Sequence, residues 1–411
     1  MSLDYLNNKN STLKAIGCCI FCGSASIGTM KSGFNVDRIL EISDDMINQN
    51  AYHFIKNFKD IPVIVPSIWE NDEYLKSLKN EKYDLFYSNV PCSGLSSINR
   101  NASTDNKANV HFYRAFDAIS KIQPRVFLIE NAPTLIKIGF PIIQKLTKIL
   151  GEQYRFTILR DYAGNHNTAM KRMRTMIVGW NRDEFDKIPA LYANKQPLFS
   201  TMDAIGDLIN KPFDESINHV CIENREWGQY EHLYKYVEAG NTSLMSFIKY
   251  WDEIKDKFDL KDQIYIEKNI EKLNNKKGIW DKSPYRPFEN GLSPSMTSLT
   301  KIIHPTLQRQ FTIREYARLM GYPDDFILYD KECKTPVVQC LAQGVPVNFF
   351  AYITNEIKEV LSGNRELIDN SENKIISFEH HIKMARELFT QEQINSMTSL
   401  DVTKNSIKME K

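Results

Sequence analysis

A single cysteine stands on a turn at the end of an apolar stretch, in the segment "SNVPCSGLSS" over residues 88–97. Cys92 follows Pro91 directly and precedes Gly94 by two residues, whereas a cysteine used only for packing usually lies inside an apolar run. A nucleophilic thiol needs solvent access and a backbone held in place, and a turn after a strand supplies both. The sequence therefore makes Cys92 a candidate nucleophile, with a half-buried structural cysteine as the alternative.

A carboxylate and a basic segment could act together with this thiol. Glu130 ends the apolar stretch in "RVFLIENAP", where apolar neighbours raise the pKa of a carboxyl group and let it act as a proton donor. Lys171, Arg172 and Arg174 in "MKRMRTMIVGW" precede another apolar stretch and could hold phosphate or carboxylate groups. The alternatives are a solvated glutamate that caps a helix and a solvated basic turn.

A turn of small residues near the N-terminus could bind a cofactor. In "KAIGCCIFCGSASIGTMKSGF", an apolar stretch runs into Gly23, Ser24, Ala25 and Ser26 and then into a helical segment. Small residues let the backbone approach a ligand, and a helix N-terminus offers free N–H groups. Glu41 ends the next apolar stretch, where an acid can take ribose hydroxyls. The pattern suits a nucleoside-bearing cofactor without a phosphate, although a purely structural turn would look the same.

Short apolar stretches that alternate with amphipathic or polar segments must position these residues. The expected strands are Leu13–Cys22, Val36–Ile42, Val63–Val65, Tyr83–Asn89, Arg125–Glu130, Tyr154–Asp161 and Thr175–Trp180. Segments such as Asp44–Asn57 and Asn109–Ile122 separate them. Strands separated by helices predict an α/β fold with a doubly wound, mostly parallel sheet. Because ligands bind at the carboxyl ends of such strands, Cys92, Glu130 and Glu41 should share one rim of the sheet.

The pattern changes after Asn181, which predicts a division into domains. Residues 1–182 are expected to form the catalytic and cofactor-binding domain, and residues 183–300 a smaller, irregular domain. Residues 301–361 should return to the first domain, with a capping box at Thr312 and Glu315 and a helix entered through Pro346. The polar tail over 362–411 is expected to hold one helix and an irregular end, and its function is unknown.

Composition narrows the class of protein. With 42% hydrophobic and 25% charged residues, the chain resembles a soluble globular protein, and no apolar run has the length that spans a bilayer. A cytoplasmic location without a membrane partner is therefore expected. Seven cysteines lack the spacing of a disulfide framework, and "CCIFC" has no second Cys/His pair near it, so no metal site is expected. A net charge of +1 does not exclude a nucleic-acid partner, because phosphate binding needs only a local basic face.

Taken in order, these segments resemble the DNA (cytosine-5) methyltransferase family. The family's cofactor turn, Pro-Cys loop, Glu-Asn-Val motif and Gln-x-Arg-x-Arg motif correspond to "FCG", "PCSGLS", "ENA" and "MKRMR" in this chain. "SPSMTS", "RQFTIREYARLMGYPDDF" and "AQGVP" resemble its later motifs, so that the resemblance covers roughly residues 14–360. It implies a class I methyltransferase fold, S-adenosylmethionine as cofactor, double-stranded DNA as substrate and a target-recognition domain over 183–300.

The resemblance also implies a role for each site residue. Cys92 would add to C6 of a flipped-out cytosine so that C5 can take the methyl group, and Glu130 would donate to ring N3. Arg174, with Arg172, would orient the base. The expected cofactor-binding residues are Phe21, Gly23, Ser24, Glu41, Ile42, Ser67, Ile68, Asn89, Pro91, Gln343 and Val345. The expected DNA-binding residues are Ser96, Arg100, Lys171 and Arg286.

Departures from the family pattern lie mostly around the cofactor. The turn after Gly23 is shorter and lacks further glycines, Ser67 takes the place of an acid, and Gln343 replaces an asparagine. They leave two alternatives, a relative that uses the same cysteine attack with another cofactor or one-carbon donor, and a DNA-binding homologue without catalysis. An RNA substrate is a further alternative. The resemblance also implies a monomer, with a cognate restriction endonuclease as partner if the chain comes from a restriction-modification system rather than a phage.

Overall fold

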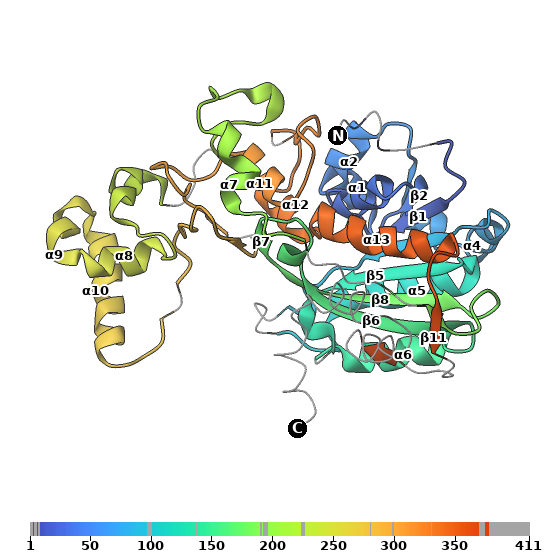
Figure 1. Cartoon of the computed structure of the whole chain (residues 1–411). Helices are drawn as coiled ribbons and strands as arrows, with labels where there is room; N and C mark the ends of the chain where they lie inside the picture. The colour runs from blue at the N-terminus through green and yellow to red at the C-terminus, as the bar shows by residue number, and fades with distance from the viewer. Residues whose placement is uncertain are drawn as a thin grey trace.

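The computed structural model describes residues 3, 6, 9–96, 101–136, 138–189, 191, 196–222, 227–279, 281–297, 300–329, 331–369 and 375–377. Its centre is a sheet of eight strands in the order β12-β6-β8-β5-β4-β1-β2-β3 (Figure 1). The strands of this sheet are β1 (Lys14–Cys18), β2 (Asn35–Leu40), β3 (Val63–Ile64), β4 (Leu85–Asn89), β5 (Val126–Asn131), β6 (Tyr154–Tyr162), β8 (Met173–Asn181) and β12 (Ile375–Ser377). Two short pairs accompany it, formed by β7 (Met170–Lys171) with β10 (Ser293–Pro294) and by β9 (Ile188–Pro189) with β11 (Leu367–Asp369).

Parallel pairing runs through the sheet except at β8. The strands β1, β2, β4 and β5 pair in parallel, whereas β8 is antiparallel to both β5 and β6. This pairing confirms the predicted doubly wound, mostly parallel sheet. Asn89 at the end of β4 pairs with Glu130 on β5, so that both strands end at the same rim. β1 ends at Cys18, earlier than predicted, because Cys19 and Phe21 turn the chain with positive φ angles of 56° and 50°.

Helices cover both faces of the sheet. On one face α1 packs against α13, and on the other α5 packs against α4 and α6. The helices are α1 (Ser24–Lys31), α2 (Ala51–Asn57), α3 (Pro66–Trp69), α4 (Asp72–Lys79), α5 (Val110–Ile122), α6 (Phe140–Leu150), α7 (Thr201–Ile205), α8 (Ser243–Lys249), α9 (Trp251–Ile254), α10 (Leu260–Asn274), α11 (Ile313–Leu319), α12 (Val337–Gln343) and α13 (Val347–Leu361). The segment Val337–Leu361 is long and apolar enough to cross a membrane by length and composition, but 67% of its apolar window is buried, as in a core helix.

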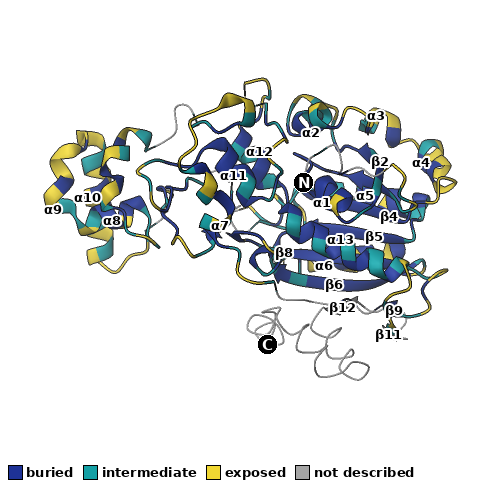
Figure 2. Cartoon of the chain, turned by 45° about the horizontal axis from the view of Figure 1, so that its top comes forward, coloured by how far each residue is buried: buried dark blue, intermediate teal, exposed yellow. Residues whose placement is uncertain are grey.

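A smaller lobe stands apart from the sheet (Figures 1 and 2). It holds α8, α9, α10 and a 3-10 helix over Gly228–Tyr236, packed around a core of its own. That core consists of Tyr230, Leu233, Tyr234, Val237, Leu244, Phe247, Ile254, Phe258, Ile266 and Ile303. Earlier residues stay with the main body, since Phe185 and Ile188 belong to the core beside the sheet and α7 packs on α11. The domain limits remain predictions, and the separate core favours a smaller domain that begins later than residue 183.

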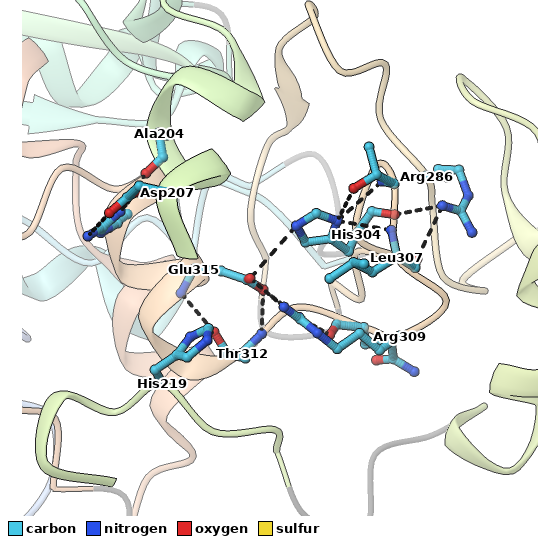
Figure 3. Close-up of polar contacts among 12 residues, drawn as sticks. Ala204, Asp207, His219, Arg286, His304, Leu307, Arg309, Thr312 and Glu315 are labelled. Carbon is cyan, nitrogen blue, oxygen red and sulfur yellow. Dashed lines mark hydrogen bonds and ion pairs between the residues drawn. The ribbon is translucent and has the colours of Figure 1, made fainter. Parts of the chain in front are cut away.

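A polar network joins the small lobe to the main body (Figure 3). Thr312 and Glu315 form the capping box predicted for α11. Burial alone would raise the pKa of Glu315, but the Arg309 guanidinium, 2.7 Å from each carboxylate oxygen, holds it below its ordinary value. Gln310 Nε2 donates to Tyr234 Oη at 2.9 Å and so reaches the core of the lobe. The lobe is therefore anchored where the chain returns to the sheet.

The described part of the C-terminal tail forms short strands. α13 begins after Pro346, as predicted. Beyond it, β11 pairs with β9 and β12 pairs with β6, two pairings that the sequence did not predict. Each of these strands is three residues long, which is too short for a hydrophobic period to identify it in the sequence. The helix expected within 362–411 stays a prediction, because most of that range lies outside the described residues.

Candidate active site

The turn that carries Cys92 is fixed by side chains from neighbouring elements. It follows β4, and Asn131 Nδ2 at the end of β5 donates to Val90 O at 2.8 Å. A Cβ atom at Gly94 would lie 2.3 Å from Asn109 Oδ1, so the turn needs a glycine at this close approach. The half-buried Cys92 thiol thus stands on a backbone held in place, as a nucleophile requires.

Glu130 lies at the same rim, at the end of β5. Its side chain is only 2% exposed. Asn89 Nδ2 donates to one carboxylate oxygen, and Arg174 Nε lies 2.7 Å from the other. Burial raises the pKa of Glu130, while the charges of Arg174 and Arg172 partly oppose the rise. The carboxyl group therefore holds a proton more readily than an exposed glutamate, and its partners fix its orientation.

Arg172 ties separate segments of the chain to this rim. Its Nη1 donates to Met296 O at 2.6 Å, and its Nη2 donates to Gly344 O at 2.8 Å. Burial lowers the pKa of Arg172, whereas electrostatic attraction to Glu130 and Cys92 raises it, which places all three within electrostatic reach. The structure therefore brings together the cysteine, the carboxylate and the arginines that the sequence singled out.

Glu41 lies directly after β2, buried beside the small-residue turn. Its two carboxylate oxygens accept the N–H groups of Ile20 at 2.9 Å and Ile42 at 3.1 Å. Burial raises the pKa of Glu41 to about 7, although these N–H donors oppose the rise. Gly23 has a φ of +89°, and a Cβ atom there would lie 2.4 Å from the Phe54 ring, so this turn also requires glycine.

The other expected cofactor residues come from several further segments of the chain. Ser67 Oγ donates to Asp44 Oδ1 at 3.2 Å, and the exposed Ile68 follows it. A carboxylate therefore stands beside Ser67, although the sequence has no acid at that position. Asn50 Nδ2 donates to Gln343 Oε1. Of the remainder, the buried residues are Phe21, Ser24 and Val345, and the half-buried residue is Pro91.

Two of the expected DNA-binding residues are accessible to a ligand. Lys171 is exposed on β7, and Ser96 is half-buried just after the Cys92 turn. Arg100 lies outside the described residues. Their contact with DNA remains a prediction.

The structure argues against the expected DNA contact of Arg286. This residue is 7% exposed, and its guanidinium donates to His304 O at 2.7 Å and to Tyr234 O at 2.9 Å (Figure 3). Backbone carbonyls of the lobe and its flanking segment accept these hydrogen bonds, so Arg286 has a structural role. An arginine in a loop-rich segment looked accessible because its carbonyl partners lie 18 and 52 residues away in the sequence.

Sequence reasoning missed several polar residues that position the site. Asp44, Asn50, Asn109 and Asn131 each contact a predicted segment from another part of the chain. Only Asn131 had a local indication, since it follows the glutamate in "ENA". The others become visible only when the chain is folded.

Comparisons with known proteins point in one direction. The model of the family described as C-5 cytosine-specific DNA methylase matches residues 19–359. The type II methyltransferase M.MthTI of Methanothermobacter thermautotrophicus is 25% identical over 305 residues, which cover 71% of this chain and 83% of the relative. The type II methyltransferase M1.HgaI of Avibacterium volantium is 24% identical over 384 residues, covering 83% and 98%. A solved structure described as a DNA modification methyltransferase encoded within an E. coli prophage is 20% identical, with a TM-score of 0.57 over 85% of this chain and 100% of that chain, a likeness of fold.

Proposed function

The chain belongs to the C-5 cytosine-specific DNA methylase family. We propose that Cys92 is the nucleophile of methyl transfer and adds to C6 of a cytosine turned out of the DNA duplex. The observation that carries the proposal is the meeting of the Cys92 turn, Glu130 and two arginines at one rim of the sheet. Family membership supports methylation at C5 of cytosine in DNA, and the geometry supports the covalent route.

The covalent step answers a chemical difficulty. C5 of cytosine is too weak a nucleophile to take a methyl group directly. When the Cys92 sulfur forms a bond to C6, an electron pair moves to C5, and one difficult step becomes two easier ones. S-adenosylmethionine, when bound, supplies an electrophilic methyl group. Loss of the C5 proton then lets the sulfur–C6 bond break and restores the ring and the thiol.

Glu130 donates a hydrogen bond to N3 of the cytosine ring. As the thiolate adds, negative charge develops on the pyrimidine, and a proton donor at N3 stabilises it. The raised pKa of Glu130 suits a carboxyl group that holds this proton. Arg174 and Asn89 fix the orientation of the carboxyl group and act as positioning residues.

The substrate must leave the base stack before this chemistry can occur. C6 is out of reach inside a duplex, and turning a base out costs a few kcal/mol. The small lobe and the exposed Lys171 supply surfaces for the phosphate and base contacts that offset this cost. The pairing of β10 with β7 ties the end of the lobe to the segment that carries Lys171. We assign target recognition to the lobe, within the expected range 183–300.

The turn around Glu41 fits S-adenosylmethionine. Glu41 would take the ribose hydroxyls, and Asp44 beside Ser67 supplies the acid that the motif lacks. Asn89 Oδ1 is buried without a hydrogen-bond partner in the part of the chain that the structure describes, so an acceptor is left for a ligand. The missing acid at Ser67 was one reason to consider a cofactor other than S-adenosylmethionine, and Asp44 weakens that reason.

Methyl transfer tests the proposal directly. The full chain is incubated with cytosine-containing duplex DNA and methyl-labelled S-adenosylmethionine. We expect label at C5 of cytosine and a loss of about a thousandfold or more in Cys92→Ala. Cys221→Ser, a change at another half-buried thiol, is the matched control and should keep the wild-type rate. Undiminished labelling by Cys92→Ala would contradict the proposal, and a covalent DNA adduct without methyl transfer would favour another donor.

A further inference from the structure

Three potential metal ligands meet close to the cofactor turn, although they lie far apart in the sequence. His53 belongs to α2, Cys340 belongs to α12, and Cys333 lies in the loop before α12; Figures 1 and 2 show the two helices near each other. The donor atoms of the three side chains all lie within 4.8 Å of one another. The methylation chemistry uses none of them.

The donors themselves are suited to a metal. Cys333 and Cys340 are reduced cysteines outside any disulfide among the described residues, and His53 and Cys340 are fully buried. His53 Nδ1 accepts the N–H of Tyr329 at 3.1 Å, whereas the buried Nε2 has no hydrogen-bond partner among the described residues. A buried polar atom without a partner in a native protein calls for an explanation, and a ligand is one. Cys22 lies close enough to Cys333 to interact with it electrostatically and is a candidate for a further donor.

We propose that His53, Cys333 and Cys340 bind one zinc ion, with Cys22 as a candidate for a fourth ligand. Two thiolates and an imidazole form a soft donor set that selects zinc over magnesium or calcium. Around a tetrahedral zinc with Zn–S bonds of about 2.3 Å, two sulfurs lie about 3.8 Å apart, so the present separations need only small side-chain shifts. Zinc binding displaces the two thiol protons. Ligation through His53 Nε2 places the ring proton on Nδ1, so Nδ1 can no longer accept the hydrogen bond from the Tyr329 N–H.

The proposed zinc site is linked to the cofactor turn through Asn50. Cys340 Sγ lies 3.3 Å from Asn50 Oδ1, and the Asn50 amide in turn donates to Gln343 in the last motif. A zinc ion would therefore clamp α2, the loop and α12 around the cofactor turn. The sequence hid this set because its members are spaced over residues 53–340, and metal motifs are recognised by short spacings.

Metal content and cobalt substitution test the site. The full, untagged chain is purified under reducing conditions from zinc-supplemented medium, and its metal is measured by mass spectrometry. We expect about one zinc per chain in the wild type, less than about one fifth of that in Cys333→Ser and Cys340→Ser, and an unchanged value in the Cys221→Ser control. Cobalt added to the wild-type apoprotein should give the near-ultraviolet absorption of a cobalt–thiolate bond, at one equivalent.

Three results would overturn the proposal. The first is wild-type protein that holds no zinc and develops no thiolate absorption with cobalt, a result that does not depend on whether any variant folds. The second is zinc that survives both serine substitutions in protein with wild-type circular dichroism. The third is a disulfide between Cys333 and Cys340, identified by peptide mapping of the non-reduced chain after the metal has been removed with a chelator, in protein that binds no zinc before reduction.

Discussion

Arg174→Gln should destabilise the protein in a manner that depends on pH, because it leaves the Glu130 carboxyl buried without its cationic partner. The Arg174 Nε to Glu130 Oε1 distance is 2.7 Å, and the two side chains are 11% and 2% exposed. Two unit charges about 4 Å apart attract by about 4 kcal/mol at an effective dielectric constant of about 20. Breaking a buried pair from one side costs about 3–5 kcal/mol. We expect a decrease of this size in the free energy of unfolding at pH 8.5.

The decrease should become smaller as the pH falls. Burial already raises the pKa of Glu130, and loss of Arg174 removes the main opposing charge, so the pKa rises further. A carboxyl group with a raised pKa in the folded state keeps its proton there after the unfolded chain has lost it. Its contribution to stability is therefore fully present below the unfolded-state pKa and is lost as the pH rises through the folded-state pKa. At pH 5.5 the variant should therefore recover part of its stability relative to the wild type.

Urea unfolding followed by tryptophan fluorescence at both pH values measures the effect. The double variant Glu130→Gln/Arg174→Gln removes both charges of this pair and should be more stable at pH 8.5 than Arg174→Gln alone. Lys9→Gln, which breaks the exposed 3.0 Å pair with Asp60, is the control and should change little at either pH. An Arg174→Gln deficit that is equal at both pH values, together with a less stable double variant, would refute the reasoning.

Three further predictions concern the cofactor turn and the DNA contacts. If only the ionised Glu41 carboxylate takes the ribose, a pKa of about 7 makes the apparent Kd for S-adenosylmethionine fall about tenfold from pH 6 to pH 8, and Glu41→Gln should abolish this dependence in calorimetric titrations. Gly23→Ala should lower the free energy of unfolding by about 1–3 kcal/mol in urea titrations, because of its φ of +89° and the 2.4 Å approach to Phe54; an unchanged value would show that the turn can relax. Lys171→Ala should reduce the salt slope of DNA affinity by about one, whereas Arg286→Gln should leave that slope unchanged and destabilise the small lobe; the reverse pattern would restore Arg286 as a DNA contact.

The sequence predicted the sheet, and it predicted that the Cys92 turn and Glu130 share one rim of it, because both rest on local patterns. Apolar runs that end in Asn89 and Glu130 identify strands, and parallel pairing then brings their ends together. The capping box at Thr312 was equally readable, since its two residues are three positions apart. In each case the information lies within a few residues of the element that it specifies.

Other features could not be predicted because they depend on partners from distant segments. The Asp44 carboxylate meets Ser67 across 23 residues, and no motif records that contact. Arg286 is buried because backbone carbonyls accept hydrogen bonds from its guanidinium. The nearest of them in the sequence, His304 O, lies 18 residues on, in an irregular segment without periodicity. The short strands of the tail likewise owe their conformation to pairing with β6 and β9.

Covalent trapping on a modified substrate tests the central claim most directly. A duplex with 5-fluorocytosine in place of cytosine blocks loss of the C5 substituent, so the sulfur–C6 bond cannot break once the methyl group is transferred. In the presence of S-adenosylmethionine we expect a complex that survives denaturation, with the DNA attached to the peptide that carries Cys92. It should form in the wild type and in Cys221→Ser and be absent from Cys92→Ser. Duplex binding without any adduct, or an adduct on a different residue, would contradict the account.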